Sequence, residues 1–492
     1  MSTLTIHQGA LTRAFSFSAP QRLAAVLEMA GQGIAHPCGG RGVCGKCAVM
    51  LTGDVSEPTE GERKNGARLS CQAVLYGDAE VILPETRAMA QIESGSDRPL
   101  EPVQPMPGRF GAAVDVGTTT LALRLYDLRS GACLAGTTML NPQTGVAADV
   151  IGRIDAAMHG GGEALRRSVE SALKAMLRTA AAQAEIAAEE VASLVVTGNT
   201  TMLYLLTGRD PCTLSRAPFA ADCLFGTEEN LLGRTCHLPD CLHAFVGADT
   251  SCAILSCGML DRAETALLLD VGTNGEIALW HGGRLYIAST AAGPAFEGAG
   301  ISCGCGSIPG AIDRVDADAG TLTIHTIGGG EAVGLCGSGL VDAIAALLEA
   351  EVIDETGAME EDEYRLAPGV TLTQKDVRAV QLAKAAIAAG TACLLHAAGC
   401  TEDDVAVVYL AGGFGSHLRL DRAAAIGLIT PVLAQRVQVV GNAALDGAAL
   451  LLTDTTLRAR LQAMKAAAQH VRLDGNALFS QRYVEEMLFG EG

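Results

Sequence analysis

The sequence predicts two folded regions of different class: a small α+β domain at the N-terminus and a larger α/β region built from two similar halves. Three observations predict this division. Four cysteines gather within residues 38–71 among short strand-like stretches, a proline-rich segment follows at 87–109, and strand–helix alternation then continues along the chain. The 492 residues are more than one ordinary domain contains.

Composition and charge exclude several classes of partner. Apolar residues make up 49% of the chain, enough for full cores, whereas the formal net charge is −20. Such an acidic surface argues against nucleic acid or anionic membrane and suits a partner with a basic patch. We find no signal peptide and no apolar stretch of the ~20 residues that a membrane span needs. We therefore expect a cytoplasmic protein whose 16 cysteines are cluster ligands or buried residues rather than disulfides.

The first 86 residues have the pattern of a small α+β domain, and the segment after them has the pattern of a linker. Residues 87–109 carry four prolines and little periodicity, which predicts an extended, semi-stiff linker. Within the domain, hydrophobic alternation and turn residues predict two short strands at 3–17, a helix at 20–30 with proline near its first turn, and strands at 47–55 and 79–85.

The cysteine-rich loop, HPCGGRGVCGKC at 36–47, fits a metal cluster better than a nucleotide. Its spacing G-x-x-x-x-G-K matches a phosphate-binding loop, but Cys47 stands where Ser or Thr is needed, and no buried strand precedes it. Cys38, Cys44, Cys47 and Cys71 give the spacing C-x5-C-x2-C-x23-C. Thiolate ligands on a glycine-rich loop suit an iron–sulfur cluster, although structural zinc also takes four thiolates. The long glycine loop among strands favours the cluster.

Residues 1–86 resemble a 2Fe–2S ferredoxin of the β-grasp type. The first spacing of five residues is similar to that of adrenodoxin-like members rather than plant-type ferredoxins. The resemblance implies one-electron transfer, with all four cysteines as ligands of the cluster.

The larger region contains an internal repeat. Residues 110–128 predict a β-hairpin that contains the D-V-G-T motif at Asp115. Residues 265–289 predict a second run of strands with the same motif at Asp270. A repeat 155 residues apart predicts two similar halves, a first lobe at 110–262 and a second lobe at 263–492.

The two hairpins have the chemistry of a nucleotide phosphate site. Glycine lets backbone N–H groups approach a phosphate, threonine hydroxyls add donors, and aspartate places a carboxylate beside Mg²⁺ or its waters. Two such hairpins in register, with a later strand that ends in GGFG, resemble the superfamily of acetate and sugar kinases, chaperone ATPases and actin. That resemblance implies duplicated ribonuclease-H-like halves and ATP as ligand. It assigns the phosphates to Asp115, Gly117, Thr118, Thr119, Asp270, Gly272, Thr273 and Asn274, and the adenosine to Gly412, Gly413 and Phe414.

Two further segments resemble the connecting elements of that superfamily. They are GADTSCAILSCGM at 247–259 and VGNAALDGAALLL at 440–452. Asp249 in the first is similar in context to the aspartate that takes a proton in sugar kinases, so it could orient water for ATP hydrolysis. The alternative is a helix N-cap that accepts backbone N–H bonds. Both roles stay open for this residue.

Three other groups of cysteine and histidine are weaker candidates for metal. Cys303 and Cys305 lie in a glycine-rich loop, where C-x-C alone is poor evidence for a cluster. We interpret the second group as part of a packed helix and the third as a loop. The second consists of Cys393, His396 and Cys400, and the third of Cys236, His237, Cys241 and His243.

The whole layout resembles the ATP-dependent reductive activators of corrinoid proteins. The domain order, DVGTTT at 115–120, DVGTNGE at 270–276 and FEGAGISCG at 296–304 carry this resemblance. It implies an ATP-hydrolysing enzyme that passes one electron from a 2Fe–2S cluster to Co(II), regenerating Co(I) in a corrinoid protein of a methyltransferase system. It also implies Mg²⁺, a low-potential electron donor and possible homodimers.

Three alternatives remain at this stage. An ATP-driven electron donor could serve another low-potential acceptor, as dehydratase activators do. A small-molecule kinase fused to a ferredoxin would transfer phosphate and perform no redox chemistry. A redox sensor would use ATP only as a structural ligand.

Overall fold

This computed structural model describes residues 2–8, 11–30, 34, 42, 47–65, 67–83, 99–318 and 321–489. Backbone contacts divide the chain into two compact units, which are described separately. Unit 1 comprises Met1–Ala88, Leu140–Ala172 and Tyr204–Ser215, and unit 2 comprises Met89–Met139, Leu173–Leu203 and Arg216–Gly492.

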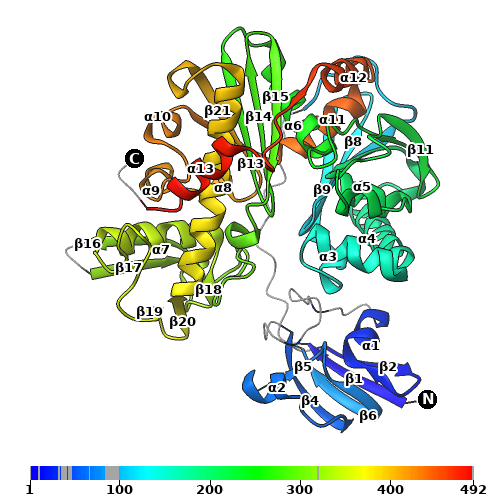
Figure 1. Cartoon of the computed structure of the whole chain (residues 1–492). Helices are drawn as coiled ribbons and strands as arrows, with labels where there is room; N and C mark the ends of the chain where they lie inside the picture. Colours follow the sequence, from blue (N-terminus) through cyan, green and yellow to red (C-terminus); the bar gives the residue numbers. More distant parts are fainter. Residues whose placement is uncertain are drawn as a thin grey trace. The chain divides into compact units, whose positions relative to one another are not determined.

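The N-terminal part of unit 1 is a mixed sheet with helices, as the sequence predicts (Figure 1). The strand order is β2-β1-β6-β4-β5, and β3 also pairs with β6. β1 is antiparallel to β2 and parallel to β6, so Leu4 and Ile6 face a buried core with Val81. The elements are β1 (Ser2–Gln8), β2 (Leu11–Phe17), β3 (Gln21–Arg22), α1 (Leu23–Met29), β4 (Ala48–Val55), α2 (Glu60–Asn65), β5 (Arg68–Leu69) and β6 (Val74–Ile82).

The first predicted helix is shorter than expected. Residues 21–22 pair with β6 as β3, and the helix begins only at Leu23, so Pro20 precedes a strand rather than the first helical turn. The other parts of unit 1 contain η1 (Pro142–Gly145), α3 (Val150–Ala156), the π-helical turn η2 (Ala157–Gly161), η4 (Cys212–Ser215), and parts of α4 (Gly162–Gln183) and α5 (Thr200–Thr207).

Unit 2 contains two six-stranded sheets with the same core arrangement, which confirms the predicted repeat (Figure 1). The first has the order β11-β12-β10-β7-β8-β9 and the second β22-β21-β13-β14-β15-β23. In each, an antiparallel hairpin carries the D-V-G-T motif, and a later strand adds in parallel beside it. The strands of the first sheet are β7 (Phe110–Val116), β8 (Thr120–Asp127), β9 (Ala132–Leu140), β10 (Val191–Gly198), β11 (Thr227–Leu231) and β12 (Arg234–Leu238).

A long helix covers the second sheet, and two smaller sheets lie in the chain between its strands β15 and β21. α8 (Gln374–Ala398) contacts β14 and β15, and α13 (Ala477–Glu485) packs on α8. The strands of this sheet are β13 (Thr265–Val271), β14 (Gly275–His281), β15 (Arg284–Thr290), β21 (Val405–Ala411), β22 (Val437–Gly441) and β23 (Gln469–His470). The other elements include η6 (Pro294–Glu297), β16 (Ala311–Asp318), β17 (Thr321–Thr326), β18 (Gly334–Leu335), α7 (Gly337–Glu349), β19 (Glu363–Ala367), β20 (Val370–Thr373), α9 (Leu420–Ala425), α10 (Pro431–Ala434) and α12 (Leu457–Ala467).

Two helices join the sheets through one shared core. α6 (Ala248–Ser256) and α11 (Ala443–Thr453) pack on each other, and α11 also contacts β7, β8 and β10. Their apolar residues share a buried cluster with Val195 of the first sheet and Leu268 of the second. The contact is so close that a Cβ on Gly447 would lie 2.1 Å from the carbonyl oxygen of Cys252. The buried Arg124 of β8 also donates to Asp446 of α11 at 2.7 Å.

The described part of the predicted linker is anchored to unit 2. The Leu100 N–H donates to the Gly131 carbonyl, the Met106 N–H donates to the Leu452 carbonyl, and Met106 is 2% exposed. Proline and low periodicity therefore do not make residues 99–109 a free tether, because their backbone groups pair with α11 and the turn after β8. Residues 84–98 lie outside the described part of the chain.

Among the described residues, one helix has the length and hydropathy that a membrane span requires. This helix is α8, with 25 residues and 72% of its most apolar window buried inside the protein. Because the helix packs against strands on one side and α13 on the other, its apolar character is explained by the core of unit 2.

We expect Gly447→Ala to lower the stability of unit 2. The added methyl group forces α6 and α11 apart, at a cost of about 1–3 kcal/mol for overpacking. The urea midpoint of unfolding, followed by fluorescence of the single tryptophan, Trp280 on β14, should fall. Gly330→Ala is the control, since a Cβ there meets nothing within 4 Å. Equal midpoints for the two variants would contradict the close packing.

Candidate functional site

The predicted cluster ligands are partly described. Cys47 follows the loop and Cys71 lies just before β6, and their sulfur atoms are 3.3 Å apart in a small buried cluster with Leu69. The Ser70 N–H donates to the Cys47 carbonyl at 3.0 Å and fixes the two segments together. Two buried thiols at this separation suit adjacent ligands of one iron–sulfur centre. Cys38 and Cys44 lie outside the described residues.

Both predicted phosphate hairpins form tight turns that a glycine N–H closes. The Gly117 N–H donates to the Thr120 carbonyl at 2.9 Å, and the Gly272 N–H donates to the Asn274 carbonyl at 3.0 Å. A Cβ on Gly117 would approach the Thr120 oxygen to 2.7 Å, so no larger residue fits this turn. The two turns follow equivalent strands of the repeat but close differently, because the first hydrogen bond spans three residues and the second spans two.

The three predicted catalytic aspartates form one electrostatic cluster. Removal from water and the Asp249 carboxylate raise the pKa of Asp115 to about 7. Burial, Asp249 and then Glu297 raise the pKa of Asp270 to about 7, and burial raises the pKa of Asp249 to about 6. Burial, and then the carboxylates of Asp249 and Asp270, raise the pKa of Glu276. Such crowding of like charges favours a bound cation.

The carboxyl groups do not form a direct metal cage. Among the residues that the structure describes, no group of three or more histidine, cysteine, aspartate or glutamate side chains is placed to hold a metal ion. Mg²⁺ keeps most of its waters in nucleotide sites and binds through one or two carboxylates and the phosphates. The arrangement is therefore compatible with a hydrated ion that arrives with its nucleotide.

Asp249 is not the N-cap of its helix, so that alternative is wrong. Gly247 occupies the N-cap position of α6, and Asp249 lies within the first turn. Its carboxylate accepts the N–H of Thr250 at 2.8 Å. A Cβ on Gly247 would meet the Cα of Asn199 at 2.5 Å, which shows how closely this turn packs on the end of β10.

Sequence reasoning missed three residues that complete the site. Asn442 donates to the Asp115 carboxylate at 3.0 Å and caps α11. Asn199 donates to the Thr118 hydroxyl at 3.0 Å. Glu297 accepts hydrogen bonds from Thr119 at 2.8 Å and Thr273 at 2.9 Å. The repeat offered a signal for Asn199, because β10 ends beside Asp115 as β21 ends beside Asp270.

The predicted adenosine motif lies against the second hairpin. Gly412 has a φ of +88°, and a Cβ there would lie 2.9 Å from the Asp270 carboxylate. Gly413 has nothing within 4 Å of its Cβ position, so a ligand could approach its backbone. Phe414 stacks on Phe296, with ring centroids 4.9 Å apart. The structure thus places these residues beside Asp270, and their role toward adenosine stays a prediction.

The weaker cysteine and histidine candidates lie at several separate places. The Cys303 sulfur accepts the Thr371 N–H at 3.4 Å, and the His243 and His470 rings stack with centroids 3.6 Å apart. Burial raises the pKa of Cys241 and Cys257 to about 12 and raises that of other buried thiols further. These other thiols are Cys236 and Cys252.

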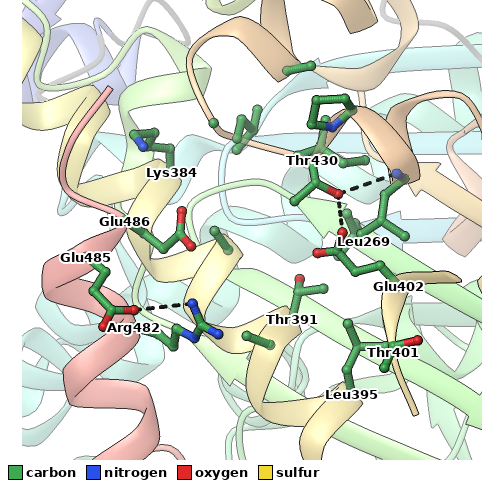
Figure 2. Close-up of a pocket in the computed structure, with 18 of the residues that line it drawn as sticks. Leu269, Lys384, Thr391, Leu395, Thr401, Glu402, Thr430, Arg482, Glu485 and Glu486 are labelled. Atoms are coloured by element: carbon green, nitrogen blue, oxygen red, sulfur yellow. Dashed lines mark hydrogen bonds and ion pairs between the residues drawn. The ribbon is translucent and has the colours of Figure 1, made fainter. Parts of the chain in front are cut away.

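A separate cavity of about 640 Å³ lies between α8, the α9–α10 segment and α13 (Figure 2). Lys384 of α8 is 1% exposed and donates to the Leu488 carbonyl at 2.6 Å, and burial lowers its pKa to about 8. Thr430 donates to Glu402 on the opposite side. Leu269 lines the cavity next to Asp270 in the chain, but none of the predicted nucleotide residues does. The cavity is therefore not the predicted nucleotide site.

Three family models match the chain in the predicted order. A model described as a 2Fe-2S iron-sulfur cluster binding domain matches residues 6–76. The RACo middle region matches residues 110–262, and the C-terminal domain of RACo, the ASKHA domain, matches residues 264–491.

Relatives of known activity span most of the chain. The corrinoid activation enzyme RamQ of Eubacterium limosum is 34% identical over 422 residues, which cover 78% of this chain and 70% of RamQ. The [Co(II) methylated amine-specific corrinoid protein] reductase of Methanosarcina barkeri is 28% identical over 426 residues, 77% of each chain. A solved reductive activator for corrinoid, iron-sulfur protein has the same fold, with a TM-score of 0.72 and 24% identity over 99% of this chain and 98% of that one. The chain belongs to the family of ATP-dependent reductive activators of corrinoid proteins.

Proposed function

We propose that this protein returns the cobalt of a corrinoid methyl-transfer protein from Co(II) to Co(I), using one electron and coupling the step to ATP. One observation carries the proposal: the convergence of two threonine-bearing hairpins and three aspartates in a chain that also holds a buried cysteine pair. Membership of the activator family supports this reading, with a 2Fe–2S cluster, ATP and Mg²⁺ as cofactors.

The cysteine pair holds the redox cofactor in this proposal. A bound 2Fe–2S cluster supplies electrons singly, which matches the one-electron difference between Co(II) and Co(I). Cys47 and Cys71 are ligands on two segments that the Ser70 hydrogen bond fixes together. Cys38 and Cys44 complete the set by their spacing.

The hairpins hold Mg²⁺·ATP. Thr118, Thr119, Thr273 and Asn274 contact the phosphates, and the tight turns at Gly117 and Gly272 hold them in place. Gly412, Gly413 and Phe414 contact the adenosine. Asp115 and Asp270 bind the hydrated ion, whose charge lets both carboxyls ionise although their pKa values are raised to about 7. Asp249 orients the attacking water, because its carboxylate adjoins both aspartates.

ATP is needed because a cluster alone passes electrons only down a potential gradient. A nucleotide that binds one conformation more tightly shifts the population toward a state in which the corrinoid can be reduced. The net charge of −20 suits a corrinoid protein with a basic docking patch. We place the protein in the cytoplasm, supplied by a low-potential electron donor and acting as a homodimer.

The cobalt spectrum tests this function directly. Full-length, cluster-loaded protein mixed anaerobically with ATP, a low-potential electron donor and a Co(II) corrinoid protein should produce Co(I) or, with a methyl donor, methyl-Co. Omission of ATP should abolish this change. Cobalt that stays Co(II) with and without ATP would overturn the proposal. Phosphate transfer to a sugar or acid would favour the kinase alternative, and reduction of a dehydratase instead would favour that class of acceptor.

Loss of a hairpin aspartate should impair ATP hydrolysis and leave the cluster unchanged. We expect Asp115→Ala and Asp270→Ala each to lower Mg²⁺-dependent ATP hydrolysis by about 10- to 100-fold, because the ion loses a carboxylate. The visible spectrum of the cluster should be unchanged. Asp403→Ala, at an exposed aspartate, serves as control and should hydrolyse ATP normally. Normal hydrolysis by both hairpin variants would refute the assignment.

Loss of a cluster cysteine should have the reverse effect. We expect Cys71→Ala and Cys44→Ala to lose the 2Fe–2S spectrum and cobalt reduction while ATP hydrolysis persists. Cys133→Ala on β9 is the matched control and should keep the cluster. Iron content and the visible spectrum are the measurements. A cluster retained in the Cys44 variant would show that the ligand set is wrong.

A further inference from the structure

Glu297 connects the two phosphate hairpins through a single oxygen atom. Its Oε2 accepts the Thr119 hydroxyl of the first hairpin at 2.8 Å and the Thr273 hydroxyl of the second at 2.9 Å. Its other oxygen lies against the second turn, where a Cβ on Gly272 would be 3.3 Å from Oε1. One carboxylate therefore links the two halves of the repeat, through Thr273 of the second motif and Thr119, which follows its equivalent Thr118 in the first.

This contact competes with any phosphate at the same place. A threonine hydroxyl has one hydrogen to donate, and both threonines donate it to Glu297. A phosphate can receive these two donors only after the carboxylate has left them. The charge of the phosphate acts in the same direction, because two anions repel each other at hydrogen-bond range.

We propose that Glu297 makes the site respond to the terminal phosphate of ATP: the carboxylate holds the hairpins together without nucleotide, and the terminal phosphate displaces it by taking both threonine donors. This inference rests on the proposed function of the hairpins as the ATP site. Glu297 is a positioning residue that acts through Thr119 and Thr273. ADP, which lacks the terminal phosphate, leaves the link in place.

The neighbours of Glu297 connect it to the adenosine motif and to α7. Phe296 stacks on Phe414 of the predicted adenosine motif. The carbonyl of Phe296 also packs on the start of α7, where a Cβ on Gly337 would lie 1.9 Å from it. Gly298 follows with a φ of +74° and ends the short helix η6. A shift of Glu297 therefore reaches the adenosine motif and α7 without crossing another element.

The substitution Glu297→Gln separates the charge from the contact. Glutamine keeps an oxygen that can accept both threonine hydroxyls, but these neutral hydrogen bonds are weaker, and the repulsion of the phosphate is gone. In the full-length protein, calorimetry with Mg²⁺ and a non-hydrolysable ATP analogue should show about tenfold tighter binding, against a change below about twofold for ADP. The KM for ATP should fall while kcat stays within about threefold.

Glu276→Gln is the matched control, because it makes the same carboxyl-to-amide change in the same acidic cluster, whereas both threonines donate to Glu297. It should change the affinities for ATP analogue and ADP by similar factors. In a Thr119→Val background, Glu297→Gln should give a smaller gain than in the wild type, since the two residues act together. Amide exchange in residues 291–306 should rise with the ATP analogue and stay unchanged with ADP.

Several results would overturn the inference. They are an unchanged ratio of ATP to ADP affinity in Glu297→Gln, an equal shift of this ratio in Glu276→Gln, or full additivity with Thr119→Val. A fall of kcat by about 100-fold at constant KM would show instead that Glu297 orients the attacking water. If the wild type binds neither nucleotide, the proposed function of the hairpins fails, which is a different result from any of these.

Discussion

The crossing of α6 and α11 is the constraint on which the nucleotide site depends. α6 follows the last strand of the first sheet, α11 follows β22 of the second, and both pack in the core that the two sheets share. Gly447 of α11 lets the two helix backbones come into direct contact at Cys252 of α6. The hairpins at the ends of β7 and β13 meet because this crossing fixes the two sheets relative to each other within unit 2. Asn442 makes the connection explicit, since it caps α11 and also binds Asp115.

The crossing also explains why the site is electrostatically unfavourable without ligand. It brings together Asp115, Asp249 and Asp270 from two sheets and one helix. Burial raises the pKa of all three, and the Asp249 carboxylate raises that of Asp115 and Asp270 further. Glu297 adds a fourth charge and also satisfies two threonine donors. Cation and nucleotide therefore replace interactions that these residues make with one another.

The architecture could be predicted from sequence largely because the repeat is local. Each D-V-G-T motif lies within one hairpin, so its turn and strands follow from a few neighbouring residues, and the parallel strands follow from long apolar runs. Glu297, Asn199 and Asn442 could not be found in this way, since their hydrogen bonds to the first hairpin span at least 81 residues of the chain. The anchoring of residues 99–109 was missed for the same reason: proline content reports local stiffness but not a hydrogen bond to residue 452. Asp249 shows the limit of local patterns, because only the backbone reveals that Gly247 caps the helix.

The buried thiols of unit 2 have a consequence for assembly of the metal centre. A thiol binds iron or reacts with an oxidant mainly as its thiolate, and burial keeps Cys236, Cys241, Cys252 and Cys257 protonated at neutral pH. Delivered iron and sulfide consequently meet little competition from these side chains. Packing thus removes these four sulfur atoms near the nucleotide machinery from competition for the metal.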